Sequence, residues 1–213
     1  MDTNQLAQEL EQLLAGNGYN FPPGLRIFGI RNNDNWELQK FDDILVLFDS
    51  SAGFTYSCWG TTTPGKPYED ETLRSSKGWP PGVLHLKKEV LQINMWGKGQ
   101  YMNTRALVQV GPAFYWRDMN QDHVQDPEEG DQYDASPGAH FHTRRGTDDN
   151  IGWASAGCQV PRFPANHERC MDIAFNYPQE RYSYCIIMKD NVPGEIFGKL
   201  TDLAAQAQVE AGM

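Results

Sequence analysis

The chain has 213 residues and lacks the features that mark several large classes of protein. It has no apolar run near the roughly 18 residues of a membrane span, so we expect no such span. Basic residues are the minority, and the formal net charge of −10 argues against nucleic acid or an anionic membrane as partner. The N-terminal residues show neither a basic start nor an apolar core, so we expect no secretory signal.

Closely spaced cysteines are also missing. The four cysteines form no CxxC pair, which argues against a structural zinc site. Cys58 and Cys185 stand in strand-like runs and Cys170 on an amphipathic helical pattern, so we predict that these three are core residues. Cys158 differs, because it follows Gly157 in a turn of small and polar residues.

What the chain does contain is a series of short strand-like runs separated by turns with proline and glycine. We predict a mainly β, α+β fold: a β-barrel or sandwich with peripheral helices at 3–15 and 195–210, in a single domain over 1–213. A further helix is predicted after Asn166, a plausible N-cap. The predicted strands are 25–31, 44–49, 54–59, 83–86, 106–110, 114–117 and 182–188.

Two histidines precede Cys158 at distances that suit a neighbouring strand. His142 lies sixteen positions and His140 eighteen positions before it. Alternate residues of a strand share a face, so either ring can point toward the sulfur. A thiol becomes a useful nucleophile when a base favours its thiolate, and imidazole is the usual partner. The pattern predicts a site for acyl transfer.

The segment 142–160, HTRRGTDDNIGWASAGCQV, resembles the signature of the L,D-transpeptidase family. In that signature a histidine is followed, roughly sixteen residues later, by Ser/Thr-x-Gly-Cys, with Ile-Gly between. More loosely, the chain looks like phage-type relatives with the same Ser-Ala-Gly-Cys-Gln-Val ending. The resemblance implies a compact L,D-transpeptidase-like β fold whose cysteine attacks a peptidoglycan stem peptide and forms an acyl-enzyme.

The resemblance also implies roles for individual residues. Cys158 would be the nucleophile and His142, whose spacing matches better than that of His140, would be the base. The N–H groups of Gly157 and Cys158, with that of Ala156, would form the oxyanion hole. The carbonyl of Thr143 would orient the imidazole, and Ser155 would brace the turn.

The chain departs from the family pattern around the cysteine. Val160 stands where the family usually has arginine, Ala156 where it often has histidine or lysine, and Thr143 where it has glycine. These changes affect the surroundings that place an acceptor, so we predict hydrolysis of stem peptides by a cysteine peptidase.

Three alternatives remain open. They are cross-linking by a true L,D-transpeptidase, a catalytically inactive structural or wall-binding module of a virion, and a cysteine hydrolase of an unrelated amide. With no leader visible, association with virion or secretion-apparatus proteins would deliver the chain to the periplasm or cell wall.

Three residues near the motif are candidates for substrate binding. Trp153, five positions before Cys158, could wall the cleft. Arg144 and Arg145 could engage a stem-peptide carboxylate, or they could form a solvated loop pair.

A second motif follows the predicted strand 114–117. Oxygen-bearing residues recur at positions 1, 3, 5, 9 and 12 of a calcium-type loop, with a carbonyl available at position 7. Position 6 is histidine where the turn usually needs glycine, so an acidic surface loop is an equal alternative. We expect no cofactor to be required for catalysis, and a calcium ion here would be structural. The predicted ligands are Asp118, Asn120, Asp122, Val124, Asp126 and Glu129.

Overall fold

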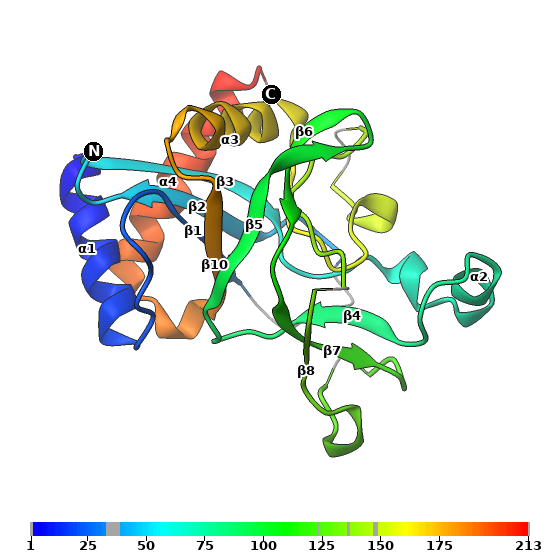
Figure 1. Cartoon of the computed structure of the whole chain (residues 1–213). Coiled ribbons are helices and arrows are strands. Elements are labelled where there is room, and N and C mark those ends of the chain that lie inside the picture. Colours follow the sequence, from blue (N-terminus) through cyan, green and yellow to red (C-terminus); the bar gives the residue numbers. More distant parts are fainter. Residues whose placement is uncertain (1, 33–38, 123, 136, 147–148, 213) are drawn as a thin grey trace.

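Two β-sheets and four α-helices make up the regular structure of the described part of the chain (Figure 1). A computed structural model describes residues 2–32, 39–122, 124–135, 137–146 and 149–212. The larger sheet has seven strands in the order β6-β5-β10-β1-β2-β3-β9, and the smaller has three in the order β4-β7-β8. The strands are β1 (Arg26–Arg31), β2 (Asp43–Asp49), β3 (Phe54–Thr61), β4 (Val83–Leu86), β5 (Gln92–Tyr101), β6 (Thr104–Gln109), β7 (Ala113–Asp118), β8 (Gln132–Asp134), β9 (Val160–Pro161) and β10 (Arg181–Met188).

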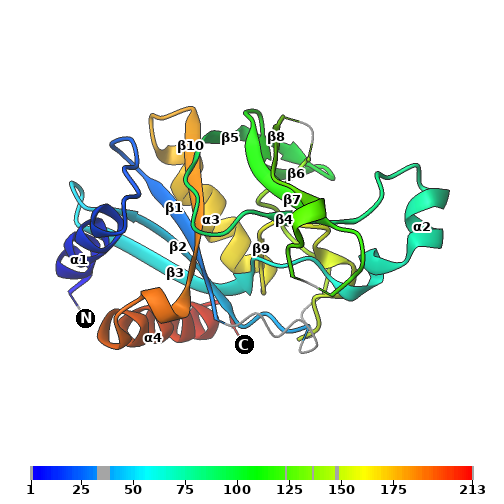
Figure 2. The same ribbon diagram turned by 90° about the horizontal axis from the view of Figure 1, so that it is seen from below.

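The helices cover the larger sheet on both sides. The first and last, α1 (Thr3–Gly16) and α4 (Gly194–Glu210), lie together against one face of β1 to β3, as both views show (Figures 1 and 2). On the other face, α3 (Pro164–Asn176) fills the interior of the curled sheet. The short α2 (Glu71–Ser76) projects from the body on the opposite side from α1. Single 3-10 turns complete the set: η2 (Lys66–Glu69), η3 (Pro127–Glu129), η4 (Gly152–Ala154) and η5 (Lys189–Asn191).

The curled sheet closes through one short segment. Phe141 pairs with Leu107 of β6 in antiparallel fashion and with Gln159, directly before β9, in parallel fashion. Leu107 and Phe141 exchange main-chain hydrogen bonds of 3.0 and 2.9 Å. On the other side, Gln159 N–H donates to the His140 carbonyl at 2.8 Å and His142 N–H donates to the Gln159 carbonyl at 3.2 Å. Residues 140–142 therefore join the two edge regions of the sheet.

The larger and smaller sheets share one apolar core. Leu84 and Leu86 of β4 and Tyr115 of β7 belong to the same buried cluster as Leu45 and Trp96 of the larger sheet. The small sheet thus packs onto the open side of the curled one and supplies a wall next to the turn that carries Cys158. None of the described helices has the length and apolar character that crossing a bilayer requires.

Most predicted elements are confirmed, with changed bounds. Helices and all seven predicted strands form where their patterns indicate, and Asp2 caps α1 by accepting from the N–H groups of Asn4 and Gln5. The mainly β expectation holds only as a mixed α and β class, because helix and strand take about 31% and 32% of the described residues. The structure adds β5, β8 and β9, which we did not predict.

The expected N-cap of the third helix is wrong. The helix begins at Pro164 with Phe163 in the cap position, and Asn166 lies inside it. There the Asn166 amide donates to the Tyr56 hydroxyl and to the Ala207 carbonyl, both at 3.1 Å. Proline is favoured at the first helical position because the N–H that it lacks would have no partner within the helix. Pro164 therefore begins the helix, two residues before Asn166.

Because Phe141 closes the sheet, its truncation should destabilise the whole fold. Phe141 is fully buried and packs edge-to-face on Trp96, with ring centroids 5.8 Å apart. We expect Phe141→Ala to lower the free energy of unfolding by about 3–5 kcal/mol, measured by urea denaturation. The matched control is Tyr133→Ala on exposed β8, expected to cost about 1 kcal/mol or less. Equal losses in the two variants would contradict the contribution of the buried Phe141 ring at the point where the sheet closes.

Candidate active site

The turn that presents Cys158 is held by its own polar groups. Ser155 is fully buried; its hydroxyl donates to the Cys158 carbonyl at 2.8 Å and accepts from the Gly157 N–H at 3.2 Å. Ser155 thus braces the turn in the way its position indicates. We expected the Gly157 N–H to be directed at an oxyanion, but it donates to the Ser155 hydroxyl within the turn.

Gly157 is required by both conformation and space. Its φ of 114° lies in a region that residues with a side chain rarely adopt. A Cβ at this position would stand 2.3 Å from Leu84 Cδ2 and 2.8 Å from the Leu84 carbonyl oxygen. The turn therefore packs directly on β4 of the small sheet.

The segment with the two histidines lies alongside this turn. Since Phe141 pairs with Gln159 in parallel register, His140, His142 and Cys158 share the opposite face of the pair. The His140 N–H faces the Cys158 sulfur at 3.4 Å, and the thiol faces the Gly138 carbonyl at 3.7 Å. Main-chain groups of His140 and Gly138 thus position the sulfur.

Hydrogen bonds give the two imidazoles different tautomers. His142 Nδ1 lies 2.5 Å from the Thr143 carbonyl, which can only accept, so Nδ1 carries the proton and neutral His142 has its lone pair on Nε2. His140 Nδ1 accepts from the Gln109 N–H at 3.0 Å, so neutral His140 carries its proton on Nε2. Of the two neutral rings, only that of His142 keeps a nitrogen lone pair that its structural hydrogen bond does not use. The Thr143 carbonyl makes the contact that the resemblance implied.

A cavity of about 860 Å³, which we call the thiol cavity, gives access to the sulfur. Its described lining includes Cys158 and His142 but not His140. Cys158 is only 7% exposed and clusters with Ile151, Phe41 and Val160, and it lines this cavity. Cys158 is thus more buried than the small residues of the motif suggest.

Burial holds both reacting groups in their neutral forms. It raises the pKa of the Cys158 thiol to about 11, although the N–H groups of His140 and Ala156 favour the thiolate. Burial lowers the pKa of His142 to about 4, despite the Thr143 carbonyl acting in the opposite direction. Between these values the resting pair is a thiol and a neutral imidazole with a free lone pair.

Aromatic residues that the sequence analysis did not single out surround the pair. The ring of Tyr101, at the end of β5, lies 4.7 Å from the His142 ring and 4.9 Å from the His140 ring, between centroids. Tyr101 and Tyr68 line the thiol cavity, and so does Trp153, as expected from its place near Cys158. Tyr101 and Tyr68 come from distant segments, and no local motif marked them.

The two arginines separate into different environments. Arg144 is 7% exposed and lies over the Phe41 ring at 4.5 Å, with its Nη1 donating to the Asn150 carbonyl at 3.4 Å. It therefore ties its loop to Phe41 while it also lines the thiol cavity, and the alternative of a solvated pair fails for it. Arg145 is exposed at the rim of the thiol cavity.

The acidic loop after β7 is held by hydrogen bonds of its own. Asp118 accepts from the Gln121 N–H, Asp122 from the Val124 N–H, and Glu129 from the N–H groups of Met119 and Asp126. Asn120 donates to both Asp122 and Asp126. In the described part of the chain no three His, Cys, Asp or Glu side chains are grouped to hold a metal. Calcium binding stays a prediction.

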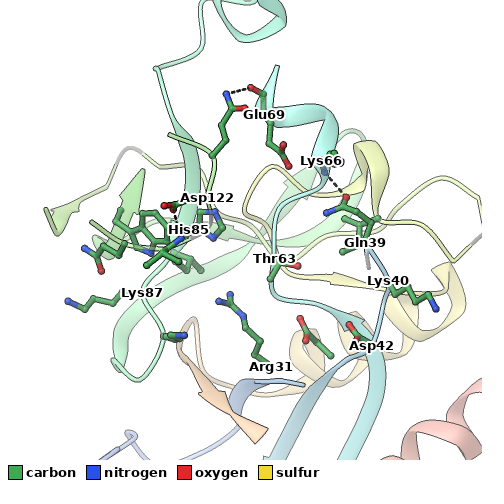
Figure 3. A pocket seen from close by; sticks show the side chains of 18 of the residues that line it. Arg31, Gln39, Lys40, Asp42, Thr63, Lys66, Glu69, His85, Lys87 and Asp122 are labelled. Atoms are coloured by element: carbon green, nitrogen blue, oxygen red, sulfur yellow. Dashed lines mark hydrogen bonds between the residues drawn. The ribbon is translucent and has the colours of Figure 1, made fainter. Parts of the chain in front are cut away.

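A second cavity of about 880 Å³, the polar cavity, shares Ile151 with the first (Figure 3). Arg31 extends into it from the end of β1, and His85 borders it from β4. Near Arg31, the carboxylate of buried Asp43 accepts from Thr62 and Asn32, and desolvation raises its pKa to about 6. Asp122 and Val124 of the predicted calcium loop also line this cavity. Its described lining contains no cysteine, so it offers no thiol for acyl transfer.

Comparison of the chain with protein-family models, with curated proteins and with solved structures finds no match.

Replacing Gly157 should break the turn while sparing distant elements. We expect Gly157→Ala to lower the free energy of unfolding by several kcal/mol and to disturb Cys158. The left-handed backbone costs a residue with a side chain about 1–2 kcal/mol, and the clash with Leu84 adds to that cost. The control is Gly18→Ala, which has a φ of 83° but open space around the new Cβ and should lose the backbone contribution alone. Urea denaturation of both variants measures the difference. Equal losses would refute the packing argument.

The neutral resting pair predicts the pH dependence of alkylation. Because only the thiolate reacts and its pKa is about 11, the rate at Cys158 with iodoacetamide should rise steadily from about pH 6 to about pH 10. Peptide mass spectrometry of timed samples measures the rate at this residue, and Cys158→Ser is the blank. A plateau reached below neutral pH would instead show a preformed thiolate–imidazolium pair.

Proposed function

We propose that this chain is a cysteine-dependent peptidase that cleaves peptidoglycan stem peptides through an acyl-enzyme on Cys158. The observation that carries the proposal is that Cys158 and His142 line one cavity while the Thr143 carbonyl leaves the His142 Nε2 lone pair free. The resemblance of residues 142–160 to the L,D-transpeptidase signature supplies the substrate class. The reaction class rests on the thiol and imidazole themselves.

The first half of the reaction follows from the neutral pair. As Sγ attacks the scissile carbonyl carbon, its proton passes to His142 Nε2 and the carbonyl oxygen becomes an oxyanion. Collapse of this intermediate breaks the C–N bond, and the imidazolium gives its proton to the leaving amine. The product is a thioester on Cys158 with His142 neutral again.

The second half returns the enzyme to its starting state. A water molecule loses a proton to Nε2 as its oxygen attacks the thioester, and the thiolate leaves and recovers the proton. The stem peptide is released as a carboxylate. An amine in place of water would give a cross-linked product, which is the transpeptidase alternative.

The oxyanion donor proposed here differs from those first expected. The Gly157 N–H is taken by Ser155 and the Ala156 N–H is directed at the Cys158 sulfur, so of the three N–H groups first expected we assign this task to that of Cys158. One such donor contributes about 3 kcal/mol of transition-state stabilisation in related chemistry. His140 acts as a positioning residue, because its N–H faces the sulfur and its ring is bonded to Gln109.

Cleavage of purified muropeptides, followed by mass spectrometry, tests the proposal. Cys158→Ala should abolish product, and His142→Ala should slow it by about a hundred- to ten-thousand-fold. His140→Gln should lose less than His142→Ala, since its ring carries its proton on Nε2. Hydrolysis gives a shortened peptide, whereas a cross-linked dimer would identify a transpeptidase. Digestion that is equal in wild type and Cys158→Ala, or absent in both, would contradict the proposal.

A further inference from the structure

Three aromatic rings form a row that leads outward from the thiol cavity. Trp153, on η4, and Tyr68, on η2, line the cavity, and Trp79 continues beyond it. The Tyr68 ring centroid lies 5.4 Å from that of Trp153 and 5.5 Å from that of Trp79. Trp153 is 59% exposed and Trp79 is 41% exposed, so their rings are available to a ligand. We call these three residues the aromatic row.

The aromatic row is fixed relative to Cys158. The Tyr68 hydroxyl donates to the Trp153 carbonyl at 2.9 Å, which ties η2 to η4. The Gly65 N–H donates to the carbonyl of Ser155 at 2.7 Å, and Ser155 in turn bonds the Cys158 carbonyl. A Cβ on Gly65 would stand 1.8 Å from the Gly152 carbonyl oxygen, which shows how closely the two segments pack. A ligand on the row therefore stands in a set position with respect to the sulfur.

The chemistry of the row favours an uncharged ligand with flat apolar faces and polar edges. Each ring has an apolar face and an N–H or O–H at its edge, and Thr104 and Asn150 add polar groups to the cavity wall. The described lining also includes the charged residues Arg144, Arg145 and Glu168, none of which belongs to the aromatic row. A sugar ring meets these demands, because its C–H faces stack on aromatic rings while its hydroxyls form hydrogen bonds.

We propose that the aromatic row binds the sugar portion of a glycopeptide whose peptide portion reaches Cys158. This inference rests on the proposed function, since in peptidoglycan each stem peptide is attached to a glycan strand. Beyond the proposed function, the inference states that the preferred substrate is a stem peptide still attached to its sugars, and not the free peptide. The row then sets which end of the substrate lies outside the thiol cavity.

Binding without turnover tests the glycan site independently of the chemistry. The probe is the β-1,4-linked trimer of N-acetylglucosamine, titrated by calorimetry into full-length Cys158→Ala. Adding Trp79→Ala or Trp153→Ala to that background should weaken binding about five- to tenfold for each ring removed. The matched control is Tyr133→Ala, a 58% exposed ring on β8, which should leave binding unchanged. Thermal unfolding verifies that each variant is folded.

Kinetics on the active chain give the second arm. Trp79→Ala should raise KM for a disaccharide-linked stem peptide more than for the same free peptide, with kcat changed little. Sugar binding that depends on the row without any peptide cleavage would uphold the glycan site and overturn the proposed function. Peptide cleavage with no sugar binding, or with binding indifferent to both tryptophans, would overturn the glycan site alone. A dimer that dissociates on Trp79→Ala without sugar binding would likewise overturn it, since the row would then be a self-association surface.

Discussion

The double pairing of Phe141 is the constraint on which the rest of the structure depends. Its bonds to Leu107 on one side, and those of its neighbours to Gln159 on the other, join the two edges of the curled sheet. Because side chains alternate along a strand, burial of Phe141 in the core turns His140 and His142 to the face that carries Cys158. A slip of one residue would send the imidazoles into the core and remove the site. Folding stability and the geometry of the candidate site therefore share one set of hydrogen bonds.

The burial that positions the thiol also sets its reactivity. Desolvation moves the pKa of Cys158 up and that of His142 down, so neither group is charged in the resting protein near neutral pH. Under the proposed function, the proton leaves the sulfur only as the carbonyl carbon is attacked, and not before. Such a site gives little reaction with small electrophiles while it is ready for a bound acyl group. Under the proposed function, the selectivity of the site would come from which ligands the thiol cavity admits.

The amino-acid pattern predicted those features that depend on near neighbours in the chain. The helices, seven strands, the brace by Ser155 and the carbonyl of Thr143 all involve residues a few positions apart. The strand β5 was not predicted, because it carries Gly97 and Gly99 and its exposed and buried residues do not alternate. The ring contacts of Tyr101 with both imidazoles join segments about forty residues apart, and the Arg144–Phe41 contact joins segments about a hundred residues apart. Such contacts follow from strand order, which local periodicity does not specify.

Ile151 lines both cavities and forms part of the wall between them, and this wall limits how an extended ligand can lie. The Ile151 N–H donates to the Gln39 carbonyl at 2.9 Å, and the Gln39 side chain accepts from the Lys66 N–H at 2.6 Å. These bonds hold Ile151, which lines both cavities, between Cys158 and the polar cavity, where Arg31 and Asp43 lie. Under the proposed function and the proposed glycan site, a chain whose carbonyl reaches the sulfur would continue toward η2 and η4, along Trp153, Tyr68 and Trp79. The hydrogen bonds of Gln39 to Ile151 and Lys66 would then separate that substrate from the buried Arg31–Asp43 pair.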